Sequence, residues 1–240
     1  GTELIHPLED LSRLVDDLEG NSKSGLIMTM GKGGVGKTIA AAAIATMLAK
    51  RGHQVLLTTT DPAAHIKDFM NQLDEIPDNL VIERIDPKVE TKNYIDKVVQ
   101  QKGAKLDEEG RKLLLEDLQS PCSEEVAVFH AFSSAIFKAK KQFVVMDTAP
   151  TGHPLLLLDT TGSYHREILK TMDSKKIKTP YMFLQDADFA KILLVALPET
   201  TPMREAEGLQ NDLKRAGIFP YAWIVNQCLS AITHLKDPIL

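Results

Sequence analysis

Gly31-Lys32-Gly33-Gly34-Val35-Gly36-Lys37-Thr38 is the stretch that decides the fold of this chain. It fits the pattern G-x-x-x-x-G-K-[S/T] of a phosphate-binding loop, which needs a strand before it and a helix after it. Leu26 to Met30 is an apolar run of strand length, and the Ala-rich stretch from Thr38 to Lys50 is helical in pattern. From average residue frequencies, a chance match in such a chain has a probability on the order of one in a hundred. The sequence therefore predicts a strand–loop–helix unit that binds phosphate.

The residue types of this loop suit the phosphate chain of a nucleotide. Glycines let the backbone turn successive N–H groups toward an anion, and the helix that begins near Lys37 adds the positive end of its dipole. We expect the Lys37 ammonium to contact the β- and γ-phosphates and the Thr38 hydroxyl to bind Mg²⁺. A merely flexible glycine turn is the competing interpretation, and the flanking strand and helix make it the weaker one.

Apolar runs of strand length recur along the rest of the chain. They cover residues 54–58, 80–82, 143–146, 192–195 and 222–225. Residues 89–140 are mostly helical in pattern, with charged faces. Continuous apolar strands separated by helices are typical of a parallel sheet covered on both faces. We therefore expect an α/β fold of the P-loop NTPase class, with a mostly parallel sheet and helices on both faces.

The first part of the chain differs from the rest. Its apolar residues, spaced to line one face of a short helix, are Leu8, Leu11, Val15 and Leu18. We expect a linker or docking arm over residues 1–24 and one P-loop domain over residues 25–240. A start without Met, and no convincing terminal element over residues 230–240, indicate a piece of a longer polypeptide that is cut short at its C-terminus.

The composition excludes several classes of protein. Of 240 residues, 43% are hydrophobic and 25% are charged, which excludes a disordered chain, a collagen-like fibre and a disulfide scaffold. The formal net charge of −5 disfavours nucleic acid as a partner. No apolar run reaches the ~18–20 residues that span a bilayer, so we expect no direct membrane insertion. Two cysteines, Cys122 and Cys228, indicate a reducing, cytoplasmic setting.

Three charged residues are candidates for chemistry near the phosphate loop. Asp147 ends an apolar run in the manner of a Walker B strand, and a carboxylate there can hold Mg²⁺. Asp61 either orients the water that attacks the γ-phosphate or caps the helix that Pro62 begins, and both can hold. Lys32 is either a solvated charge or reaches a phosphate across an interface, as an arginine finger does. The loop alone leaves these two interpretations of Lys32 about even.

A cysteine stands at an expected helix start. In Ser120-Pro121-Cys122, Ser120 is the expected N-cap and Pro121 the first helical residue. The helix dipole favours a thiolate at Cys122, while the two glutamates that follow oppose it. From the residues alone, a free cysteine packed as a small hydrophobe is the better interpretation. His153, taken alone, is an ordinary loop histidine.

Taken in chain order, the motifs resemble one family. The phosphate loop looks like the deviant Walker A motif, with Lys32 as its signature lysine. Three further stretches are similar to the arsenical pump-driving (ArsA) ATPases, namely Thr59 to His65, Ser120 to Glu125 and Asp147 to His153. The resemblance covers residues 25–240 and is closest to the second of two homologous halves. Residues 1–24 resemble the linker between those halves.

The resemblance implies a role for each matching residue. The residues implied to bind ATP are Gly31, Lys32, Gly33, Gly34, Val35, Gly36, Lys37, Thr38 and Ile39, with Asn226 at the adenine. Thr38 and Asp147 would hold Mg²⁺, Asp61 would position the attacking water, and Lys32 would act on the nucleotide of the opposing half. The residues implied to bind As(III) or Sb(III) are Ser120, Cys122 and His153. Such soft ions favour thiolates, and one thiol cannot make a three-sulfur site, so a partner half would supply the others.

The resemblance also implies an activity and partners. The activity is ATP hydrolysis that arsenite or antimonite stimulates and that drives arsenite efflux through a separate membrane pump subunit. The opposing half would be a homologous N-terminal ATPase half or a second copy of the chain. An arsenite metallochaperone is a further implied partner. The protein would be cytoplasmic, and peripheral to the inner membrane when it is bound to the pump.

The sequence departs from the family pattern in two places, and other functions compete. Ile39 stands where the family usually has a second Thr, and the chain ends before the segment that completes the adenine pocket. The main alternative is the targeting ATPase for tail-anchored membrane proteins, whose C-x-x-C pair and Met-rich helices this chain lacks. A partitioning switch needs a basic amphipathic helix or a basic patch, and a nitrogenase-type reductase needs cluster cysteines. The sequence shows neither pattern.

Overall fold

The computed structural model describes residues 7–32, 36–59, 66, 70–71, 75–148 and 178–226. Its elements, in chain order, are α1 (Pro7–Glu19), β1 (Gly25–Met30), α2 (Lys37–Lys50), β2 (Val55–Thr59), β3 (Leu80–Arg84), α4 (Pro87–Lys102), the 3₁₀ turn η1 (Gly103–Lys105), α5 (Glu108–Leu118), α6 (Pro121–Lys138), β4 (Phe143–Asp147), α8 (Pro180–Gln185), β5 (Ala190–Ala196), α9 (Thr200–Arg215) and β6 (Ala222–Val225). Within these ranges, every helix is too short or too polar to cross a lipid bilayer.

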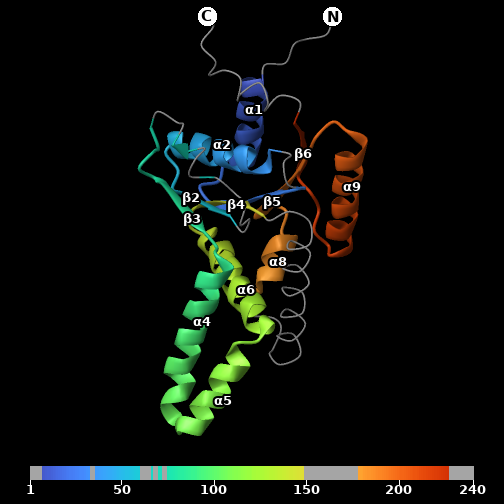
Figure 1. Cartoon of the computed structure of the whole chain (residues 1–240). Helices are drawn as coiled ribbons and strands as arrows, with labels where there is room; N and C mark the ends of the chain where they lie inside the picture. Colours follow the sequence, from blue (N-terminus) through green and yellow to red (C-terminus); the bar gives the residue numbers. More distant parts are fainter. Residues whose placement is uncertain are drawn as a thin grey trace, which may run out of the picture.

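The strands form one sheet in the order β3-β2-β4-β1-β5-β6, and each pairs in parallel with its neighbours (Figure 1). This confirms the predicted α/β fold, although β2 begins and ends one residue later than the apolar run indicates. Because all the strands run the same way, their carboxyl ends share one edge of the sheet, which we call the carboxyl edge. The phosphate loop leaves β1 at this edge, and Asp147 ends β4 there.

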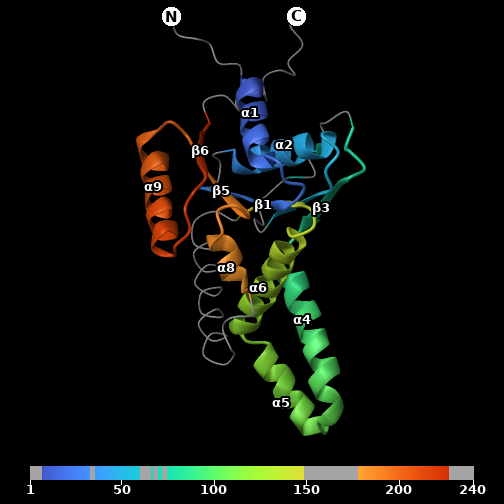
Figure 2. The same ribbon diagram turned by 180° about the vertical axis from the view of Figure 1, so that it is seen from behind.

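Alternate side chains of the strands pack on opposite faces of the sheet. From β1, Leu26 and Met28 join a core with α6, α8 and α9, whereas Ile27 joins a second core with α1 and α2. Figures 1 and 2 show α1 and α2 on one side of the sheet and α6 and α8 on the other. Burial on both faces explains why the strands are continuous apolar runs in the sequence.

Three helices form an arm that extends from the sheet. α4 and α5 project away from the sheet, and α6 runs back to it (Figures 1 and 2). Asp86 and Asp107 cap α4 and α5, because each side chain accepts a hydrogen bond from a backbone N–H group of its helix. α4 has no buried residue, whereas α6 buries Phe132 and Ile136 against the sheet. The helical pattern predicted over residues 89–140 is thereby confirmed.

Helix α1 packs against α2. Val15 and Leu18 are fully buried in the core that α2 shares with the sheet, as the predicted apolar face requires. At the end of α1, Glu19 accepts a hydrogen bond from Arg51 Nη1 at 2.5 Å, and its other carboxylate oxygen lies 2.5 Å from His53 Nε2. The helix predicted near the start of the chain is confirmed. Its role as a linker or docking arm remains a prediction.

We expect the docking of α1 to depend on pH through Glu19. The hydrogen bond with His53, and then that from Arg51, holds the pKa of Glu19 below its usual value of 4.5. A carboxyl group whose pKa falls on folding stabilises the fold above its unfolded pKa and loses that contribution as the pH drops through the folded value. We expect Glu19→Gln to lower the free energy of unfolding by about 1 kcal/mol at neutral pH.

Urea denaturation measures this effect across pH. The penalty of Glu19→Gln should shrink and then disappear as the pH falls through the lowered pKa of the wild-type carboxyl group, because that group is then protonated as well. Glu75→Gln, at an exposed carboxylate away from Arg51 and His53, is the matched control and should leave the free energy of unfolding unchanged. A penalty that stays constant with pH would contradict the assignment.

Candidate functional site

The carboxyl ends of β1, β2 and β4 bring polar side chains together. β4 lies between β1 and β2, and Asp147 is in register with Thr29 of β1 and Thr59 of β2. Both hydroxyl groups donate to its carboxylate, Thr29 Oγ1 to Oδ1 at 3.2 Å and Thr59 Oγ1 to Oδ2 at 3.4 Å. The register of the sheet therefore holds Asp147 from both neighbouring strands.

The start of α2 supplies two further donors to this carboxylate. Lys37 Nζ donates to Asp147 Oδ1 at 2.8 Å, and Thr38 Oγ1 donates to Oδ2 at 2.7 Å. Lys37 Nζ also donates to the carbonyl oxygen of Thr148. The side chains of Lys37 and Asp147 are 3% and 0% exposed, so this ion pair is buried. A buried charge is costly without a partner, and here one cation and three hydroxyl groups satisfy the carboxylate.

The first turn of α2 has the geometry that an anion site requires. Gly36 precedes the helix with φ 86° and ψ 16°, a left-handed conformation that strains residues with a Cβ atom. The first turn contains no acidic side chain of its own, so the helix keeps the positive end of its dipole available to an anion or carboxylate. Ile39 lies half-buried in this turn. Because its side chain is apolar, it adds no hydroxyl group to the site.

The oxygen atoms of Thr38 and Asp147 fit a small divalent cation. Hydroxyl and carboxylate oxygens are hard ligands of the kind that Mg²⁺ prefers, and these two lie 2.7 Å apart. Among the described residues, no group of three or more His, Cys, Asp or Glu side chains could hold a metal ion. A Mg²⁺ ion at this place would therefore take its other ligands from water and nucleotide phosphates, as is usual for this ion.

Lys32 forms an ion pair that the sequence does not indicate. Its Nζ donates to Oε1 of Glu205 at 3.1 Å, and the two side chains are 48% and 35% exposed. Glu205 lies in the second turn of α9, which follows β5, the strand paired with β1. The amphipathic pattern over residues 200–215 signals a helix. Nothing local in that pattern indicates that Glu205 faces the phosphate loop.

Asn226 lies at the same edge of the sheet. It directly follows β6, and its backbone N–H donates to the carbonyl oxygen of Ala196, the last residue of β5, at 2.8 Å. Because β5 separates β6 from β1, Asn226 stands two strands away from the strand that leads into the phosphate loop. Its contact with adenine remains a prediction.

Ser120 and Cys122 are placed away from the side chains around Asp147. Ser120 is the N-cap residue of α6 and Pro121 follows it, as expected, although Ser120 makes no side-chain capping hydrogen bond. The backbone of Cys122 lies in the first turn of α6, at the end of the helix that is remote from the sheet (Figure 1). With 18 residues, α6 is about 27 Å long at 1.5 Å per residue.

The remaining predicted site residues fall outside the described ranges. They are Gly33, Gly34, Val35, Asp61 and His153, and the side chain of Cys122 also belongs to this group. Their assigned roles stay predictions from the sequence. The part of the site that the structure describes in detail is therefore the group of buried side chains around Asp147.

Comparison with known proteins tests the resemblance. The family model described as an anion-transporting ATPase matches residues 24–182, a range that includes the phosphate loop and Asp147. The chain belongs to the anion-transporting ATPase family. This family member is 57% identical over 97% of its length to "Arsenical pump-driving ATPase" of Escherichia coli, and 57% identical over 100% of its length to the protein of that name from Acidiphilium multivorum. The resemblance to the arsenical pump-driving ATPases is thereby confirmed.

Two further facts define the extent of this similarity. The chain spans 39% of the length of the E. coli relative and 41% of that of the A. multivorum relative. A protein named "ATPase ASNA1 homolog 2" from Paramecium tetraurelia is 35% identical over 55% of this chain and 43% of its own length. The similarity to the bacterial relatives is thus higher in identity and covers more of this chain.

Proposed function

We propose that this chain is one nucleotide-binding half of an ATPase that arsenite or antimonite stimulates and that drives arsenite efflux through a separate membrane pump. The observation that carries the proposal is the meeting of Lys37 and Thr38 with Asp147 at the carboxyl edge. A lysine, a hydroxyl group and a carboxylate at a helix start are the groups that Mg²⁺-dependent phosphoryl transfer uses. Identity of 57% to relatives named arsenical pump-driving ATPases supports the arsenical part.

In the proposed cycle, the donors around Asp147 exchange partners. Lys37, which now donates to the carboxylate, would donate to the β- and γ-phosphates of ATP, and Thr38 and Asp147 would hold Mg²⁺. The bound ion would neutralise negative charge on the phosphate oxygens. Asp61 positions the attacking water, and Lys32 acts on the nucleotide of the opposing half. Asn226 contacts the adenine.

Helix α6 offers a route by which a metalloid can act on the nucleotide site. Ser120, Cys122 and His153 are the proposed metalloid ligands, and the N-terminal turn of a helix favours the thiolate that such an ion needs. α6 leads from Cys122 back to the sheet, and β4 follows it in the chain and ends at Asp147. A shift of the start of α6 would therefore reach the carboxylate through two consecutive rigid elements.

The proposed assembly contains more than this chain. Because the chain spans 39–41% of the bacterial relatives, a homologous half is the proposed partner across the nucleotide site, with a second copy as its substitute. Such a half would also supply the thiols that Cys122 alone lacks. A membrane pump subunit and an arsenite metallochaperone complete the proposed set of partners.

Serine in place of Cys122 tests the metalloid part. We expect Cys122→Ser to raise the half-saturating concentration of antimonite by at least about tenfold, because a hydroxyl group is a poor ligand for a soft ion. The measurement is the ATPase rate of the assembled two-half protein as antimonite is titrated. Cys228→Ser is the matched control and should respond as the wild type does. Equal stimulation of the Cys122→Ser protein and the wild type would remove Cys122 from the metalloid site.

A targeting chaperone for membrane-protein helices is the second candidate function. It is favoured by the apolar residues that the arm exposes, since Leu113 is 62% and Val89 is 53% exposed. The discriminating experiment adds an apolar helical peptide or antimonite to the ATPase. Binding of the peptide without any response to antimonite would support the chaperone and contradict the metalloid-driven function.

A further inference from the structure

The two lysines that the phosphate-loop motif contains are each paired with a carboxylate of the same chain. Lys37 forms a buried ion pair with Asp147, whereas Lys32 forms a partly exposed ion pair with Glu205. The two pairs therefore differ in strength. A buried, fully hydrogen-bonded pair is hard to break, and an exposed pair is easily exchanged because water and salt screen it.

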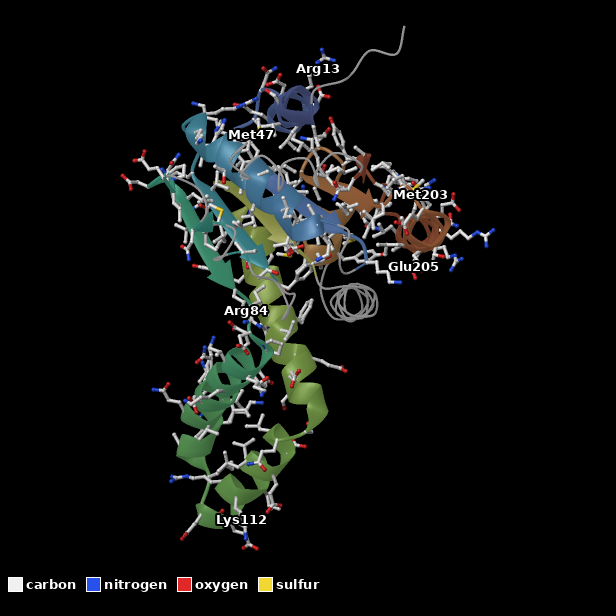
Figure 3. The ribbon with its side chains drawn as sticks, turned by 45° about the horizontal axis from the view of Figure 1, so that its top comes forward. Arg13, Met47, Arg84, Lys112, Met203 and Glu205 are labelled. Atoms are coloured by element: carbon white, nitrogen blue, oxygen red, sulfur yellow. The ribbon has the colours of Figure 1, made fainter. Side chains whose placement is uncertain are left out.

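Packing fixes Glu205 in place, whereas Lys32 is free to extend. β5 pairs with β1, so α9 begins beside the strand that leads into the phosphate loop. Ala206 and Leu209 are buried and anchor α9 on the sheet, which sets the position of the neighbouring Glu205. Figure 3 shows Glu205 on α9, on the side of the helix nearer to α2. The lysine side chain is long and 48% exposed, so it is the mobile member of the pair.

The carboxylate of Glu205 depends on Lys32. Its Oε1 accepts from Lys32, whereas its Oε2 is buried and has no hydrogen-bond partner among the described residues. A carboxylate that is partly withdrawn from water holds a nearby ammonium more firmly than a fully solvated carboxylate does. Glu205 is therefore a local competitor for the Lys32 ammonium.

We propose that Glu205 is a positioning residue that retains Lys32 within its own chain until the phosphates of an opposing nucleotide take the lysine over. This inference rests on the proposed function, in which Lys32 acts on the nucleotide of the other half. A triphosphate carries more negative charge than one carboxylate, so it outcompetes Glu205 once the halves close. Glu205 thereby lowers turnover whenever the halves are not closed on each other.

The chemical reactivity of Lys32 tests the pair directly. Acylation with trace acetic anhydride needs an unprotonated amine that has left its ion pair, and peptide mass spectrometry reports the rate at each lysine. In the full chain, Glu205→Gln should raise the acylation rate of Lys32 by about twofold to fivefold, the range for a partly exposed pair. Glu207→Gln, at an exposed glutamate of the same helix, should leave that rate unchanged. An equal rate in the wild type and Glu205→Gln overturns the proposal.

Turnover tests the positioning role. In the assembled two-half protein, Glu205→Gln should raise the unstimulated ATPase rate by about twofold to fivefold without changing the melting temperature. In a Lys32→Ala background, Glu205→Gln should have no further effect, because Glu205 acts only through Lys32. A rate increase that persists in that background, or a lower rate in Glu205→Gln alone, overturns the proposal. The acylation result requires no metalloid, so a failure of the proposed arsenical function is recognised separately by the absence of any antimonite response.

Discussion

Replacing Lys37 with alanine is expected to abolish nucleotide binding, with a Kd for MgATP at least about a hundredfold higher than that of the wild type. The reason is that, in the proposed site, the ammonium group would supply charge-assisted hydrogen bonds to the β- and γ-phosphates. Isothermal titration calorimetry of the full chain with MgATP measures the effect directly. Lys50→Ala, at the exposed last residue of the same helix, is the matched control and should bind as the wild type does.

The same substitution also affects the fold. Lys37 neutralises Asp147, which is fully buried, so its loss leaves an uncompensated charge and should cost about 3–5 kcal/mol of stability. Lys37→Gln is the milder variant, because it removes the same charge but keeps a polar side chain with an amide donor in place of the buried cavity that alanine leaves. A folded Lys37→Gln protein that binds MgATP with wild-type affinity would reject the phosphate-loop assignment.

Replacing Asp147 with asparagine is the second substitution with a large expected effect. It removes the carboxylate that accepts from Thr29, Lys37, Thr38 and Thr59, and with it the charge that lies 2.8 Å from the buried Lys37 ammonium. We expect the free energy of unfolding to fall by about 3 kcal/mol and the rate of ATP hydrolysis to fall at least about a hundredfold, since the proposed Mg²⁺ site loses its carboxylate ligand. Urea denaturation and a phosphate-release assay measure the two quantities.

A double variant shows whether the stability loss comes from the ion pair. Lys37→Gln/Asp147→Asn removes both charges of the buried pair, so its unfolding free energy should exceed the value that the sum of the single losses predicts. Asp117→Asn, at an exposed carboxylate in α5, is the control for the chemical change itself. Additive losses in the double variant would show that the two side chains do not act as a pair.

The strands and the parallel sheet follow from local patterns in the sequence. In runs such as Val144 to Met146, the side chains that point to either face of the sheet are apolar, because helices cover both faces. The motif over residues 31–38 indicates the strand before it and the helix after it, and β1 and α2 lie there. Register, by contrast, is a property of two strands together. The alignment of Asp147 with Thr29 and Thr59 could therefore not be predicted from any one run.

The candidate site divides in the same way. Lys37, Thr38 and Asp147 could be predicted because each belongs to a motif whose spacing reflects its chemistry. Glu205 could not, because its partner Lys32 lies 173 positions away in the chain and no local pattern links the two. Glu19 belongs to the same group, since its partners Arg51 and His53 come from the end of α2 and the turn after it.

By itself, the sequence determined the fold class, the phosphate loop, and the helix start that carries Cys122. These depend on hydrophobic periodicity and on residues adjacent in the chain, so short-range chemistry specifies them. Only the tertiary structure decided which carboxylate holds which lysine. Lys37 forms an ion pair with Asp147, and Lys32 forms one with Glu205, because the strand order places β4 and β5 on either side of β1. Opposite charges pair when they lie close together in space, and tertiary packing decides which residues lie close together.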